Sequence, residues 1–209
     1  MAARTPDPHQ EAVLALRKQD RALARIISRV GPCGLVINRR GTHFEALCSS
    51  ITSQQVTGAA ARTIFGRVRA LGERGRFPSP ARVLELGPES LRTAGLSRQK
   101  IAALLDLSEK IESGALALGG LARLPDEAVI ERLTTVRGIG RWTAEMILLF
   151  RLGRPDILAA TDLGIQKGIL VVDQRDSLPT PKEVLSRGER WAPWRSVASW
   201  YLWRASELT

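Results

Sequence analysis

Apolar residues recur at helical spacing along most of the chain, and this pattern predicts an all-α fold. From His9 to Val30 the apolar positions fall on the face of one helix, and Gly31-Pro32 marks its end. The segment LGIQKGILVV after Asp162 fits a helix or a short buried strand. No repeat period appears, which argues against a solenoid. Further helices are predicted at about 44–51, 59–71, 80–86, 88–93, 97–113, 126–136, 182–192 and 193–208.

The sequence from Leu133 to Asp162 places a glycine hairpin and a lone carboxylate on either side of an apolar helix. Gly138-Ile139-Gly140 separates two predicted helices, and the second begins at about Arg141. Glycine allows backbone torsions that a side chain forbids, and the first N–H groups of a helix can hold a phosphate. Arg141 and Thr143 would add a guanidinium and a hydroxyl. Because Gly-x-Gly also forms ordinary tight turns, the pattern alone leaves both interpretations open.

Composition narrows the possible partners and cofactors. The chain of 209 residues has 31 Lys and Arg against 21 Asp and Glu, a net charge of +10 that favours polyanionic partners. Two cysteines and two histidines supply neither a disulfide framework nor a zinc or iron-sulfur ligand set. The N-terminus lacks the apolar core of a signal peptide, and the apolar runs are too short to cross a bilayer. We therefore expect a soluble protein of the reducing cytoplasm.

Other polar and aromatic residues have a structural and a functional interpretation. An isolated Asp162 before a helix is typical of an N-cap. The adjacent Gln54 and Gln55, at a predicted junction of two helices, are typical of a solvated turn or of a tip that enters duplex DNA. The tryptophans near the C-terminus favour core packing, which we expect for at least one of Trp191, Trp194 and Trp200.

Five motifs, taken together and in order, resemble a known family. They are ITSQQVTGAAA, GLSRQK, VRGIGRWTAEM, ATDLGI and WAPWRSVASWYLWR. Their order and spacing resemble the DNA-3-methyladenine glycosylase II family of the helix-hairpin-helix DNA glycosylase superfamily, from about Asp20 onward. The resemblance implies an all-α helix-hairpin-helix DNA glycosylase fold, with two helical subdomains flanking an active-site cleft. Residues 1–209 would form one catalytic unit, with 45–155 as the subdomain that carries the hairpin and 1–44 plus 156–209 as the second.

The resemblance also implies a role for individual residues. Asp162 matches the catalytic aspartate, and Gln55 falls where the family places its intercalating residue, with Gln54 beside it. The base pocket would be formed by Trp142, Met146, Leu163 and Trp203. Backbone contacts would come from Gly138, Ile139, Gly140, Arg141 and Thr143, and a Na⁺ or K⁺ would bind the main-chain carbonyls of Thr134, Val136 and Gly138.

The expected activity is excision of alkylated purines, of the 3-methyladenine and 7-methylguanine type, from double-stranded DNA by a monomer. Trp142 stands where strand-cleaving relatives use a lysine, and a four-cysteine cluster is missing, so no lyase activity, iron-sulfur cluster or catalytic cofactor is expected. Met146 replaces an aromatic residue of some relatives, so the preferred lesion is not predicted, and the role of Arg195 is open. A non-catalytic helix-hairpin-helix DNA-binding module and a helical protein-interaction domain are the alternatives.

Overall fold

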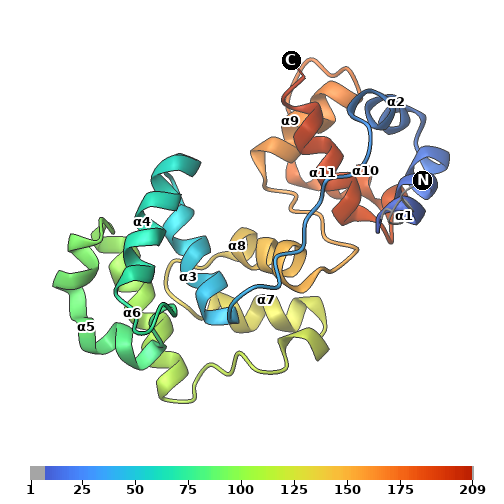
Figure 1. Cartoon of the computed structure of the whole chain (residues 1–209). Coiled ribbons are helices and arrows are strands. Elements are labelled where there is room, and N and C mark those ends of the chain that lie inside the picture. The colour runs from blue at the N-terminus through green and yellow to red at the C-terminus, as the bar shows by residue number, and fades with distance from the viewer. Residues whose placement is uncertain (1–7, 209) are drawn as a thin grey trace, which may run out of the picture. The chain divides into compact units, whose positions relative to one another are not determined.

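Every regular element of the computed structural model, which describes residues 8–208, is helical (Figure 1). This confirms the all-α prediction and decides the open case after Asp162 in favour of a helix. The helices are α1 (Gln10–Gln19), α2 (Arg21–Val30), α3 (His43–Ser53), α4 (Gly58–Ala70), α5 (Pro80–Thr93), α6 (Arg98–Glu112), η1 (Leu121–Arg123), α7 (Asp126–Thr134), α8 (Arg141–Met146), η2 (Ile147–Leu152), α9 (Leu163–Val172), α10 (Pro181–Gly188), η3 (Glu189–Trp191) and α11 (Arg195–Ala205).

The internal contacts of the chain divide it into two compact units. The hairpin unit comprises residues 38–152, and the terminal unit joins the residues up to Ile37 with those from Gly153 onward. The corresponding boundaries predicted from the sequence lie at 44/45 and 155/156, and that division into subdomains stays a prediction.

The hairpin unit is built around α3, which packs against α4, α6 and η2. Thr42 is the N-cap of this helix, because its Oγ1 accepts a hydrogen bond from Glu45 N at 3.1 Å. Helix α5 contains the non-helical Gly87, with φ of 66°, which matches the two short helices predicted there. Fully buried aliphatic side chains fill the core, among them Leu47, Ile51, Val68, Leu91, Leu104, Leu107, Val129, Leu133 and Leu148.

In the terminal unit, α11 lies against α9 and α2. Gly168 makes the close approach of α9 and α11 possible, because a Cβ atom at this position would lie 2.3 Å from the main-chain oxygen of Leu202. Any side chain would therefore push the two helices apart. The core of this unit contains Leu16, Leu23, Ile27, Ile165, Ile169, Trp191, Tyr201 and Leu202.

The single helix predicted from His9 to Val30 is wrong, because Asp20 divides it into α1 and α2. Its backbone is extended, with φ of −145° and ψ of 104°, and its carboxylate accepts from Leu23 N at 3.0 Å. Trp191 Nε1 also donates to this carboxylate at 2.8 Å, and Arg187 forms an ion pair with it. Burial on its own would raise the pKa of Asp20, but these bonds outweigh it and hold the pKa below its ordinary value. The apolar stripe continues through the break, so periodicity could not reveal it.

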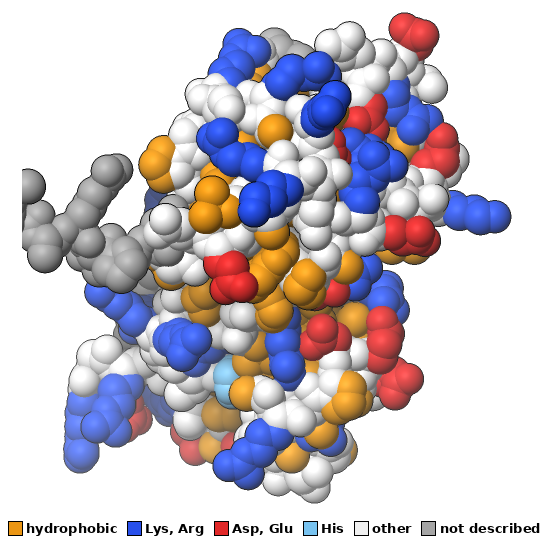
Figure 2. All heavy atoms as spheres, turned by 90° about the vertical axis from the view of Figure 1, so that its right-hand side faces the viewer, with side chains coloured by type: hydrophobic (Ala, Val, Ile, Leu, Met, Phe, Trp, Pro, Cys, Tyr) orange, Lys and Arg blue, Asp and Glu red, His pale blue; other side chains and the backbone are white. Residues whose placement is uncertain are grey.

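The surface carries the excess of positive charge found in the sequence. Figure 2 shows Lys and Arg side chains spread over one face, with Asp and Glu side chains and apolar patches among them. Across residues 8–208, none of the helices combines the length and the apolar character that a membrane crossing requires.

Candidate active site

The predicted hairpin is present between α7 and α8, and Gly138 is the residue that its backbone requires. Gly138 has φ of 76°, in the left-handed region, and an added Cβ atom would lie 3.2 Å from Ala103 Cβ. Gly140 is the N-cap of α8 and has φ of −91°; no side chain caps this helix. The main chain at the start of α8 can therefore approach an anion closely.

The side chains of the hairpin divide between the interior and the surface. Ile139 is 3% exposed and Thr143 is 4% exposed, so both side chains belong to the interior. Arg141 Nη1 donates to Glu127 Oε2 at 3.0 Å, and Arg141 Nε donates to Glu145 Oε1 at 3.1 Å. The hydrogen bond from Arg141 holds the pKa of Glu127 below its ordinary value. A phosphate would have to share this arginine with two carboxylates, and the Thr143 hydroxyl lies beneath the surface that a phosphate could reach.

A cavity of about 430 Å³ brings together several of the predicted pocket residues in the hairpin unit. Trp142 is 41% exposed beside Met146, which is 9% exposed, and Gln55 lies on the loop between α3 and α4. This volume falls within the range of ligand pockets, about 300–1,000 Å³. Three small hydroxyl residues on the last turns of α3 also line the cavity and were not predicted from the sequence: Ser49, Ser50 and Ser53.

In the terminal unit, Asp162 is both a helix cap and a fixed carboxylate. Asp162 Oδ1 accepts from Ile165 N at 2.9 Å at the start of α9 and from Trp203 Nε1 at 2.9 Å. Gly164 makes room for this contact, since an added Cβ atom would lie 2.7 Å from Trp203 Cδ1 and 3.0 Å from Asp162 Oδ1. The structure thus brings together two predicted site residues from distant parts of the sequence. Leu163, which follows Asp162, is 53% exposed.

The loop that leads to Asp162 is fixed by the first turn of α11. Arg195 Nε and Nη2 donate to the two carboxylate oxygens of Asp156 at 2.6 and 2.7 Å. Ser196 Oγ donates to the main-chain oxygen of Arg154 at 2.6 Å and accepts from Ile157 N at 3.0 Å. Burial would raise the pKa of Asp156, but the bonds from Arg195 outweigh it and lower the pKa. Arg195, whose role the sequence left open, binds the loop in this structure.

The aromatic residues divide between core and site. Trp191 is fully buried, which confirms the core packing expected for at least one C-terminal tryptophan. Trp200 packs edge-on against Tyr201, with ring centroids 4.9 Å apart. Trp203 is half-buried and is oriented by its hydrogen bond to Asp162. Trp191 and Trp203 each donate to a carboxylate, but Trp191 is fully buried and Trp203 is not, and the partner of Trp203 is a predicted site residue.

The main-chain carbonyls expected to bind a cation lie on and beside the hairpin. Val136 O accepts from Ile139 N at 3.1 Å, and Gly138 O accepts from Gln54 Nε2 at 2.9 Å. A carbonyl oxygen has two lone pairs, so each keeps one for a ligand. The oxygens of Thr134, Val136 and Gly138 therefore fit a hard monovalent cation chemically.

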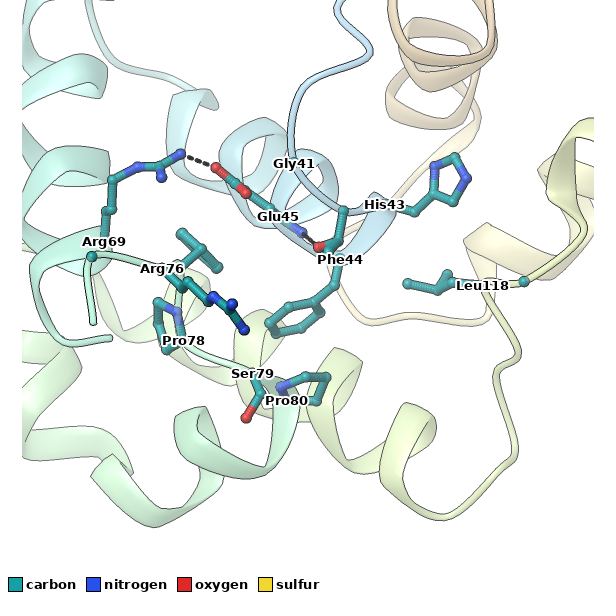
Figure 3. A pocket seen from close by; sticks show the side chains of 14 residues that line it. Gly41, His43, Phe44, Glu45, Arg69, Arg76, Pro78, Ser79, Pro80 and Leu118 are labelled. Carbon is teal, nitrogen blue, oxygen red and sulfur yellow. Dashed lines mark hydrogen bonds and ion pairs between the residues drawn. The ribbon is translucent and has the colours of Figure 1, made fainter. Parts of the chain in front are cut away.

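A larger cavity, of about 640 Å³, lies at the other end of α3 (Figure 3). Phe44, Phe77 and two prolines line it, and Arg69 and Glu45 form an ion pair at its edge. The α3 residues that line it belong to the N-terminal turn, whereas those that line the cavity beside Trp142 belong to the C-terminal turns. Eleven residues of helix separate these ends by about 16 Å. This cavity is separate from the candidate site.

The sequence from residue 48 to residue 193 matches the profile of the HhH-GPD superfamily base excision DNA repair protein. DNA-3-methyladenine glycosylase 1 of Schizosaccharomyces pombe is 40% identical over 166 residues, which cover 79% of this chain and 73% of that protein. The chain belongs to the HhH-GPD superfamily and, within it, to the DNA-3-methyladenine glycosylases.

Two further comparisons bear on this family. A solved structure of the Schizosaccharomyces pombe 3-methyladenine DNA glycosylase Mag1, in complex with abasic DNA, superposes with a TM-score of 0.85 at 36% identity and covers 96% of this chain and 98% of that one. The putative DNA-3-methyladenine glycosylase YfjP of Bacillus subtilis is 34% identical over 169 residues, which span 59% of its length. The helix-hairpin-helix fold predicted from the sequence is thereby confirmed.

Proposed function

We propose that this protein is a monofunctional DNA glycosylase of base excision repair that releases alkylated purines from duplex DNA by hydrolysing the N-glycosidic bond. Membership in the DNA-3-methyladenine glycosylase family supports the reaction class. The observation that carries the assignment of the site is the Asp162 carboxylate, fixed by Trp203 Nε1 and by the first turn of α9. Asp162 is the proposed catalytic residue.

Hydrolysis of the N-glycosidic bond of an alkylated purine requires few catalytic groups beyond this carboxylate. Cleavage of the glycosidic bond develops positive charge on the sugar, as in glycosidases, and an anionic side chain stabilises that charge. The same carboxylate can orient or deprotonate the attacking water. An N-alkylated purine is already cationic and leaves as a neutral base, so a separate general acid is not required.

Recognition of the base would come from the indoles of Trp142 and Trp203. A cationic base over an indole face gains about 0.5–2 kcal/mol, depending on how far water is excluded. This modest gain supports broad substrate tolerance, to which easier flipping of damaged nucleotides adds. The serines of the α3 wall would meet the edge of a base held against Trp142.

The hairpin would bind the DNA backbone through its main chain, and Gln55 would fill the space of the displaced base. A Na⁺ or K⁺ on the carbonyls of Thr134, Val136 and Gly138 would bridge the hairpin to a phosphate. We further propose that the protein acts as a monomer in the cytoplasm, where double-stranded DNA with alkylated bases is its partner.

Incubating the protein with a methylated duplex tests the assignment. We expect free 3-methyladenine and 7-methylguanine, abasic sites, and no strand breaks before alkali treatment. DNA binding without base release would instead support a non-catalytic hairpin module, and no DNA binding would support a protein-interaction domain.

A further inference from the structure

The loop that carries Gln55 is tied to the hairpin by the side-chain amide of Gln54. Gln54 Nε2 donates to the main-chain oxygen of Gly138 at 2.9 Å and to Thr143 Oγ1 at 3.3 Å. Gly138 lies in the turn of the hairpin, and Thr143 lies in the first turn of α8. The amide therefore connects the junction of α3 and α4 with the turn of the hairpin and with the start of α8.

Gln55 has a backbone conformation that needs support from its surroundings. Its φ is 54°, in the left-handed region, where the Cβ atom of a residue other than glycine is crowded. Such conformations persist where neighbouring structure holds them. The N–H of Gln54 makes only a long contact, 3.4 Å, with Ile51 O at the end of α3. The side-chain bonds of Gln54 are the stronger hold on this loop.

A second contact fixes the helix that precedes the loop. Lys100 Nζ, on α6, donates to the main-chain oxygen of Thr52 at 2.7 Å, and burial lowers the pKa of Lys100. This contact anchors the last turn of α3. Thr52 lies two residues before Gln54, so the contact with Lys100 does not hold the loop itself. The position of the loop relative to the hairpin depends on Gln54.

We propose that Gln54 is a positioning residue that holds Gln55 in register with the hairpin. The proposal rests on the proposed function, in which the hairpin grips the backbone while Gln55 enters the duplex. A loop held in advance does not have to be ordered during binding, which favours insertion. Gln54 then serves the DNA complex through Gln55.

The variant Gln54→Met tests this role, because it keeps the length of the side chain and removes the donor. Both hydrogen bonds from Gln54 Nε2 are lost, and each changes an equilibrium by roughly two- to tenfold, so affinity for a duplex with an abasic-site analogue should fall by at least about that factor. The single-turnover rate of 7-methylguanine release should fall with it. Affinity for an undamaged duplex of the same sequence should stay unchanged. Gln54→Glu, which keeps the shape but not the donor, should reproduce the loss.

Gln99→Met is the matched control. Gln54 and Gln99 both line a further cavity, of about 400 Å³, and Gln99 is exposed. It should bind both duplexes like the wild type. Both Gln54 variants should melt within about 4 °C of the wild type, since the side chain is only partly buried.

A double-mutant cycle with Gln55→Ala separates positioning from a merely structural role. If Gln54 acts through Gln55, Gln54→Met should have no further effect on abasic-duplex binding once Gln55 is alanine. The proposal would be overturned if the double variant lost affinity by the product of the two single-variant losses. It would also be overturned if Gln54→Met bound the abasic duplex like the wild type. A wild-type protein that releases no methylated base would overturn the proposed function instead, and the binding cycle would still decide the role of Gln54.

Discussion

Trp203→Phe isolates the hydrogen bond that orients the candidate catalytic carboxylate. The change removes the Nε1 donor that lies 2.9 Å from Asp162 Oδ1 and leaves an aromatic ring on α11. Asp162 keeps its bond from Ile165 N at 2.9 Å, so α9 keeps its cap. The variant should therefore fold and should differ from the wild type mainly at the site.

The expected fall in the rate of base release has two contributions. A hydrogen bond to a charged group contributes about 1.5–3 kcal/mol, and the lower end applies because both side chains are only half-buried. That lower end corresponds to roughly a tenfold change in rate. Phenyl also binds cations more weakly than indole, so release of 7-methylguanine should fall by about 10- to 100-fold in total.

Single-turnover release of 7-methylguanine from a defined duplex measures this loss. Trp200→Phe makes the same chemical change on the same helix, at a residue that packs against Tyr201, and should leave the rate near that of the wild type. If Trp203→Phe releases the base within twofold of the wild-type rate, the indole does not orient Asp162 for catalysis.

Two further predictions concern packing and stability. Gly164→Ala should lower base release at least about tenfold, because its Cβ would lie 2.7 Å from Trp203 Cδ1 and would move the indole away from Asp162; Gly66→Ala on α4, which meets no atom within 4 Å, should leave base release unchanged and serves as the control. Asp20→Asn should lower the free energy of unfolding in urea by about 1.5–3 kcal/mol, since the ion pair of Asp20 with Arg187 is lost while Arg187 keeps Asp173 as its second partner. The pKa of Asp20 is lowered in the folded state, so its stabilisation is complete at neutral pH, and the difference between the two proteins should shrink as the pH falls below about 4. An unchanged difference at low pH would contradict this.

Local sequence patterns predicted most of the helices, because helix caps and turns depend on residues that are close together in the sequence. Thr42 and Ser97 cap α3 and α6 as short side chains before apolar stripes should, and Gly138 adopts the left-handed torsion that its hairpin needs. The break between α1 and α2 at Asp20 was not predicted, because the apolar stripe runs through it. What fixes Asp20 in the interior is Arg187 and Trp191, far away in the sequence.

Contacts between residues far apart in the sequence could not be predicted in the candidate site either. The motifs predicted Asp162 and Trp203 as site residues, but not the hydrogen bond between their side chains, which lie 41 residues apart. The link from Gln54 to Gly138 spans 84 residues, and no periodicity or local pairing rule reports such a contact. Asp162 also shows that the two interpretations of an isolated aspartate are compatible, since a helix cap is one way to fix a carboxylate.

Asp162→Asn tests the central assignment most directly. Asparagine is an equally good N-cap and keeps an acceptor for Ile165 N and Trp203 Nε1, so the change removes the charge and little else. Removal of one such stabilising group typically lowers a rate by about 10²–10³-fold. We predict wild-type affinity for an abasic duplex and release of methylated adenine slowed by at least about 100-fold. Release at a near-normal rate by this variant would contradict Asp162 as the catalytic residue.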